Sequence, residues 1–95
     1  MHINLTGHHV EITESIRKHV IQKFDKLERF FEHINNVHIV LSREKLHQIA
    51  EATLHINNGE IHAKSNSDNM YTSVDSLSDK LAKQLNKHKK KMNHH

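Results

Sequence analysis

The sequence predicts an α+β fold, a two-layer sandwich with the element order β-α-β-β-β-α and both helices packed on one face of a four-stranded sheet. Two stretches repeat apolar residues at intervals of three and four, which is the spacing of an amphipathic helix. Four other stretches alternate apolar and polar residues, as half-buried strands do. One apolar sheet face and one apolar stripe on each helix are buried most economically when they form two layers.

The first strand and the first helix are expected within residues 2–32. Apolar residues alternate from His2 to Thr6, and Thr13 is a suitable N-cap for a helix from Glu14 to about Glu32. The stripe that this helix should bury consists of Ile16, Val20, Ile21, Phe24, Leu27, Phe30 and Phe31. Because the stripe holds three of the four aromatic residues, it should supply much of the core volume.

Three further strands are expected between the helices. Residues 37–42 and 50–57 alternate apolar with polar side chains, and residues 43–47 between them are expected to form a polar loop. The first two strands should be parallel, because a helix connects them, and the remaining strands should be antiparallel.

A hairpin is expected between the last two strands. Asn58-Gly59 favours a type I′ turn, since both residues tolerate positive φ, and the returning strand should run through Ser65. A two-residue loop at this point would place His55 directly opposite His62 on the polar face of the sheet.

The last helix, residues 69–91, carries the clearest functional signal. Its apolar stripe consists of Met70, Val74, Leu77, Leu81 and Leu85. A second stripe, roughly 110° around the helix, consists of Lys80, Lys83, Lys87 and Lys91. From Lys80 onward there are six lysines and no acid, whereas residues 1–79 hold eight Lys or Arg against eleven Asp or Glu. Clustered ammonium groups on a rigid scaffold indicate a polyanionic partner, and the alternative is a solvated charged face.

Composition narrows the functional classes. The 95 residues are expected to form one domain over 1–91, followed by a short disordered tail at 92–95. There is no cysteine for a disulfide or a thiolate metal site, and no apolar run approaches the length of a membrane span. The acids are scattered without a paired nucleophile and base, so we expect neither an enzyme nor a cofactor. A cytoplasmic monomer without membrane contact is the expectation.

Several short segments, spread in order over nearly the whole chain, form a specific combination. They are Leu5-Thr6-Gly7, Val10-Glu11-Ile12-Thr13, Ile16-Arg17, Lys23-Phe24-Asp25-Lys26-Leu27-Glu28, Glu51-Ala52-Thr53-Leu54-His55, Asn58-Gly59-Glu60-Ile61-His62-Ala63, Met70-Tyr71 and Asp79-Lys80-Leu81-Ala82-Lys83-Gln84-Leu85-Asn86-Lys87-His88-Lys89. This combination resembles the family of short ribosome hibernation promoting factors. Asn69 stands where that family usually has Asp, and either residue can cap a helix.

The resemblance implies the same fold and a ribosomal partner. It implies binding to the small ribosomal subunit and its rRNA, in the channel between head and body where messenger and transfer RNA would lie. It also implies a block of translation in stationary phase or stress, with inactive ribosome dimers formed together with ribosome modulation factor.

The resemblance also assigns candidate rRNA contacts. Basic positions of the family match Arg17, Lys23 and Lys26 in the first helix and Lys80, Lys83, Lys87 and Lys90 in the second. The helical pattern alone adds Arg29 and Lys91. These side chains would neutralise phosphates, while the shape of the channel supplies specificity. No aromatic stacking platform is expected, because the aromatic residues fall mainly in apolar stripes, and Tyr71 is expected to be a buried anchor.

Two alternatives accompany this interpretation. A basic helix can dock on an acidic protein, so a protein-binding regulator of the sigma-factor modulator type is the rival function. The chain also has twelve histidines, of which His38, His55 and His62 are expected on the polar face of the sheet. They are weak metal-ligand candidates, and we expect no metal because no carboxylate or cysteine completes the set.

Overall fold

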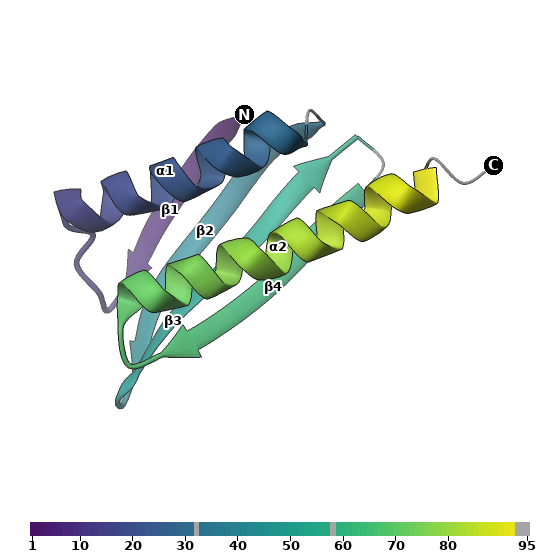
Figure 1. The fold of residues 1–95 in the computed structure, drawn as a ribbon. Helices are drawn as coiled ribbons and strands as arrows, with labels where there is room; N and C mark the ends of the chain where they lie inside the picture. The colour runs from purple at the N-terminus through teal and green to yellow at the C-terminus, as the bar shows by residue number, and fades with distance from the viewer. Residues whose placement is uncertain (32, 58, 93–95) are drawn as a thin grey trace.

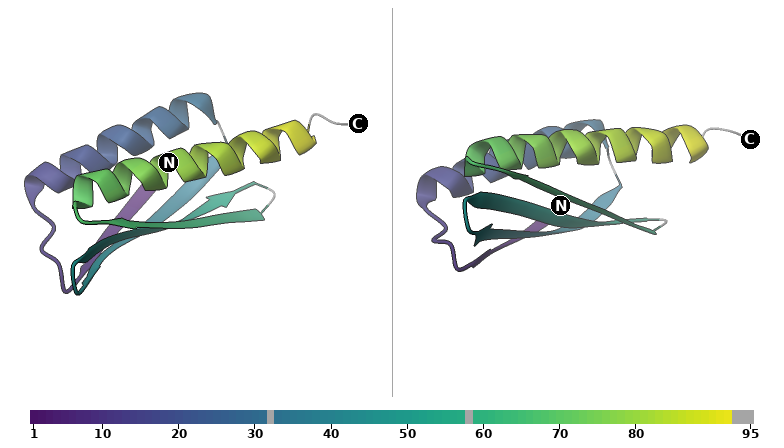
Figure 2. Two further views of the ribbon diagram at one scale, coloured as in Figure 1. Left: turned by 60° about the horizontal axis from the view of Figure 1, so that its bottom comes forward. Right: turned by 90° about the horizontal axis from the view of Figure 1, so that it is seen from below.

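The computed structural model describes residues 1–31, 33–57 and 59–92, with the backbone alone for 89–92. The elements are β1 (His2–His8), α1 (Glu14–Phe30), β2 (Ile34–Glu44), β3 (His47–Ile56), β4 (Gly59–Ser67) and α2 (Met70–Met92). The strands form one sheet in the order β1-β2-β3-β4, with β1 parallel to β2 and the other neighbours antiparallel. Both helices lie on one face of it, and no described element covers the other (Figure 1, Figure 2). The predicted two-layer sandwich is confirmed.

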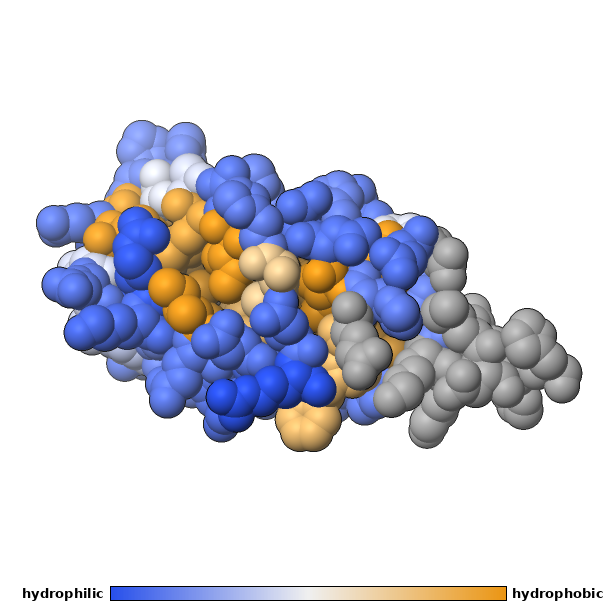
Figure 3. Space-filling model, turned by 90° about the horizontal axis from the view of Figure 1, so that it is seen from above, coloured by the Kyte–Doolittle hydropathy of each residue, from blue (hydrophilic) through white to orange (hydrophobic). Residues whose placement is uncertain are grey.

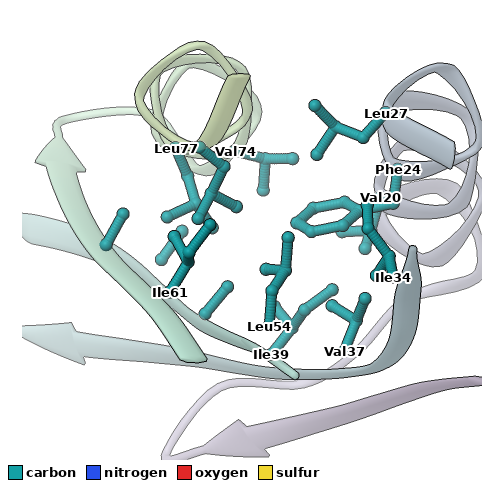
Figure 4. Packing of buried hydrophobic residues seen from close by; sticks show 14 of the residues in the cluster. Val20, Phe24, Leu27, Ile34, Val37, Ile39, Leu54, Ile61, Val74 and Leu77 are labelled. Carbon is teal, nitrogen blue, oxygen red and sulfur yellow. The ribbon is translucent and has the colours of Figure 1, made fainter. Parts of the chain in front are cut away.

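The core lies between the helices and the sheet. The buried apolar side chains of the two helices are Ile16, Val20, Phe24, Leu27, Val74, Leu77, Leu81 and Leu85. They pack on apolar residues of β2, β3 and β4, and the Phe24 ring projects from α1 into the middle of the cluster (Figure 4). Both helices are thereby fixed to the sheet by one continuous apolar core.

The buried stripe of α1 is narrower than the sequence predicts. Ile21 is 39% exposed and Phe30 is 72% exposed, so neither belongs to the core. The helix also ends earlier than expected, because Phe31 leaves the helical conformation with φ −134° and ψ 96° and donates its backbone N–H to the Leu27 carbonyl. The Phe31 side chain packs against the core, whereas that of Phe30 lies outside it.

The stretch expected to be a polar loop, residues 43–47, is instead a tight hairpin between β2 and β3. Glu44 pairs with His47, so that only Lys45 and Leu46 form the turn. Lys45 has φ 56°, the positive value that the first central position of a type II′ turn requires. The expectation was wrong because neither turn residue is a glycine or asparagine, which are the usual signals for positive φ.

The hairpin between β3 and β4 has a different register from the predicted one. Ile56 pairs with Gly59, so His55 lies opposite Glu60, and His62 lies opposite Thr53. The predicted pairing of His55 with His62 is therefore wrong by two residues. Gly59, with φ 152°, is the first residue of β4 rather than part of the turn. A shift of two residues keeps every side chain on its expected face, which is why the core prediction survived.

Gly7 of β1 has a steric requirement that a mutation can test. A Cβ atom at this position would collide with the backbone oxygen of Val10 and lie 3.0 Å from the side chain of Ile12. Because a backbone atom cannot move as a side chain can, we expect Gly7→Ala to lower the free energy of unfolding by about 1–3 kcal/mol. Urea unfolding measures it, and Thr6→Ala, at an exposed neighbouring position, should change stability by about 0.5 kcal/mol at most. Equal stability of Gly7→Ala and wild type would contradict the packing described.

Candidate nucleic-acid interface

The start of α2 is fixed by side-chain hydrogen bonds. The Asn69 side-chain oxygen accepts from the backbone N–H of Tyr71 at 2.9 Å and of Thr72 at 3.4 Å, as an N-cap does. One turn later, the fully buried Ser73 hydroxyl donates to the Gln48 carbonyl of β3 at 2.6 Å. The first turn of α2 is thus attached to the sheet by a polar contact that the sequence pattern does not reveal.

Two side chains of α2 also hold the free edge of β4. Lys80 Nζ donates to the Lys64 carbonyl at 2.8 Å, and Gln84 Nε2 donates to the His62 carbonyl at 2.9 Å. These two donors are four residues apart and therefore lie on the same side of α2. Lys80 consequently leans toward the sheet, and its ammonium group keeps two of its three hydrogens for another partner.

Lys83 and Lys87 form the accessible basic surface of α2. Both are exposed, and neither makes an ion pair with any described residue. Helical geometry places them on the side of α2 away from its buried stripe. Lys90 and Lys91 continue the helix, but their side chains lie outside what the structure describes.

The candidate residues of α1 do not form a single surface. Lys23 is half-buried, with Nζ 3.4 Å from Asp75 Oδ1, so it is a contact between the helices. Arg17, Lys26 and Arg29 are exposed. At 100° per residue, however, Arg17 and Lys26 are about 180° apart around the helix. Lys26 and Arg29, three residues apart near the end of α1, therefore form an accessible basic pair on a side of the helix that Arg17 does not share.

A polar seam joins α1 to α2, and we define it as Ser15, His19, Lys23, Tyr71 and Asp75. The Ser15 and Tyr71 hydroxyls lie 2.7 Å apart, and His19 Nε2 lies 2.7 Å from Asp75 Oδ1. The His19 ring also packs edge-on against the Tyr71 ring, with 5.1 Å between centroids. Tyr71 is 39% exposed, so the expectation that it is buried was wrong; its hydroxyl reaches across to α1 instead. The spacing of four residues on both helices was the available sequence signal for the seam.

Comparison with known proteins assigns the chain to a family. The model of the family described as Sigma 54 modulation protein / S30EA ribosomal protein matches residues 3–93. The chain belongs to this family. S30EA relatives include the ribosome hibernation promoting factors of Klebsiella oxytoca and Escherichia coli K12, which are 56% and 52% identical over 95 residues and are matched over the full length of both chains.

Two solved structures show the same fold. A ribosomal subunit interface protein from Coxiella burnetii superimposes with a TM-score of 0.87 at 34% identity, covering 94% of this chain and 98% of its own. The N-terminal domain of Thermus thermophilus Protein Y superimposes with a TM-score of 0.85 at 27% identity, covering 93% and 99%.

The uncovered face of the sheet carries histidines paired with glutamates, unlike the lysine-rich surface of α2. His62 Nε2 lies 2.9 Å from Glu51 Oε2, and His55 Nδ1 lies 3.5 Å from Glu60 Oε2. His38 lies opposite Thr53, which separates it from His62 on β4. Within residues 1–31, 33–57 and 59–92, no group of three or more possible ligands could hold a metal ion.

In the described part of the chain, neither α1 nor α2 is long and apolar enough to cross a bilayer.

Proposed function

We propose that this protein is a ribosome hibernation factor that binds rRNA of the small ribosomal subunit and occupies the channel of messenger and transfer RNA. The observation that carries the proposal is α2, a helix attached to the sheet through Ser73, Lys80 and Gln84. It presents Lys83 and Lys87, neither of which forms an ion pair with a described residue. Membership of the S30EA family, with relatives named for ribosome hibernation, supports a ribosomal partner.

The mechanism is binding and exclusion rather than chemistry. Lys83, Lys87, Lys26 and Arg29 would neutralise phosphates of folded rRNA and release counterions, with the remaining hydrogens of Lys80 as a fifth contact. Such contacts fix position and orientation, while the match between the domain and the shape of the channel provides specificity. Translation stops because a folded domain and an RNA strand cannot fill the same volume.

Further partners follow from the same proposal. The protein would act in the cytoplasm, where ribosomes are, and would bind them as a monomer. Inactive ribosome dimers would form together with ribosome modulation factor. In such a dimer this chain would block the channel, and it would not form the contact between the two ribosomes.

Sedimentation with purified small subunits tests the proposal. We expect the protein to travel with the subunit in a sucrose gradient at low salt. With about five phosphates neutralised, its affinity should fall roughly 10²- to 10³-fold between 50 and 200 mM salt. Absence of the protein from the subunit fraction at low salt would contradict the proposal.

Nuclease treatment separates an RNA partner from a protein partner. Salt weakens binding to either, because both would present negative charge to the same lysines. Digestion of the rRNA should abolish co-sedimentation. A complex with an acidic protein that survives nuclease, in place of subunit binding, would favour the protein-binding regulator instead.

A further inference from the structure

Two consecutive aromatic residues, Phe30 and Phe31, lie at the end of α1, and only one of them packs against the core. Phe31 packs against the core, whereas the Phe30 side chain is 72% exposed. Phe30 is the last residue of the helix, and the next residue is tied back by the hydrogen bond from Phe31 N–H to the Leu27 carbonyl. A large apolar ring is therefore exposed to solvent from a helical position. The expectation that Phe30 belongs to the buried stripe of α1 was wrong.

Phe30 lies on the same side of α1 as the residues that contact α2. It follows Lys26 by four residues and Lys23 by seven, so the three side chains leave the helix in similar directions. His19 and Lys23 are engaged with Asp75, but Lys26 and Phe30 beyond them are exposed. Along α1, the polar seam is thus followed by the exposed side chains of Lys26 and Phe30.

The charge around Phe30 is suited to an anionic polymer. Arg29 precedes it and is exposed, and Glu28 is paired with the N-terminal ammonium of Met1 at 2.8 Å. The upper side of the molecule, where α1 and the edge strand β1 lie, shows apolar surface flanked by hydrophilic side chains (Figure 3). An aromatic face beside two cations combines the contacts that proteins use for a nucleobase and its phosphates.

We propose that Phe30 stacks on an unpaired nucleobase of the rRNA, while Lys26 and Arg29 bind the phosphates on either side of that base. The inference rests on the proposed function and adds a base contact to a surface so far made only of phosphate contacts. Stacking on an aromatic ring accepts any base, because every base has a π face. Phe30 therefore increases affinity for an exposed base at a defined place without reading its identity.

Substitutions of Phe30 test the stacking contact on purified small subunits. Phe30→Ala and Phe30→Leu should each weaken binding about 5- to 150-fold, since stacking of one base contributes that range in affinity. Phe30→Trp should bind at least as well as wild type. The matched control is Leu46→Ala, because Leu46 is 83% exposed in the β2–β3 turn and should have no effect on binding.

The Phe30→Trp variant provides a second, spectroscopic measurement. The chain has no tryptophan, so the introduced indole would be its single tryptophan fluorophore. Stacking on a base should quench its fluorescence when small subunits are added. Wild-type affinity of Phe30→Ala or Phe30→Leu, or an unquenched indole in the complex, would overturn the inference while leaving the proposed function intact. Wild type that fails to bind the subunit would overturn both.

Discussion

Reversal of three charges on α2, Lys80/Lys83/Lys87→Glu, is expected to weaken binding to the small subunit by roughly a hundredfold or more. Each substitution would remove a proposed phosphate contact and add a repulsive charge at the same place. The helix should persist despite the loss of the Lys80 hydrogen bond to the Lys64 carbonyl, because all three side chains are exposed and Glu favours helices as much as Lys does. Circular dichroism confirms the fold of the variant, and sedimentation with small subunits measures the loss.

A matched triple variant separates the position of the charges from their number. Arg43, Lys45 and Lys64 are also exposed, but they belong to the sheet and to the β2–β3 turn. Changing them to Glu alters the net charge by the same amount. We expect this control to bind within a few-fold of wild type. Equal losses in the two variants would show that net charge alone drives binding, and full binding by the α2 variant would exclude α2 as the interface.

Phe24→Ala is expected to have the largest effect on stability. The Phe24 side chain is fully buried, and its ring fills the space between the two helices and the sheet (Figure 4). Removing a buried phenyl group costs about 3–5 kcal/mol, from lost transfer energy and the cavity that remains. Since small domains unfold with a total of about 5–15 kcal/mol, the variant should lose a large fraction of the free energy of unfolding. Urea unfolding followed by circular dichroism measures the change.

The control for this prediction is the same substitution elsewhere in α1. Phe30→Ala removes the same phenyl group from an exposed position, so its effect on the free energy of unfolding should be within about 0.5 kcal/mol. Similar destabilisation by Phe24→Ala and Phe30→Ala would contradict the assignment of one ring to the core and the other to the surface.

The layers of the fold were predictable because periodicity records burial directly. The period-two strands and the stripes of α1 and α2 each identified the side that packs, and Thr13 and Asn69 marked the helix starts by their capping chemistry. The sequence pattern determines the ends of a helix and the width of its buried stripe less well. Whether Phe30 or Phe31 enters the core depends on where the chain leaves the helix, and nothing in the local pattern distinguishes the two.

Turn geometry and contacts between elements account for the other errors. The positive φ of Lys45 could not be predicted, because lysine does not favour that conformation. The register between β3 and β4 depended on whether Gly59 lies inside the turn or after it. The lysines of α2 were visible in the sequence, but the hydrogen bond of Lys80 to β4 and the ion pair of Lys23 with Asp75 depend on tertiary distances. Sequence therefore located the basic residues and could not show which of them are free to bind.

A cryo-electron microscopy reconstruction of small ribosomal subunits saturated with this protein would show directly whether the domain fills the channel. We expect density for the two-layer domain between head and body, with Lys83, Lys87 and the end of α1 against rRNA and the path of messenger RNA filled. Density for the domain elsewhere on the subunit, with the channel open, would contradict the proposed block of translation.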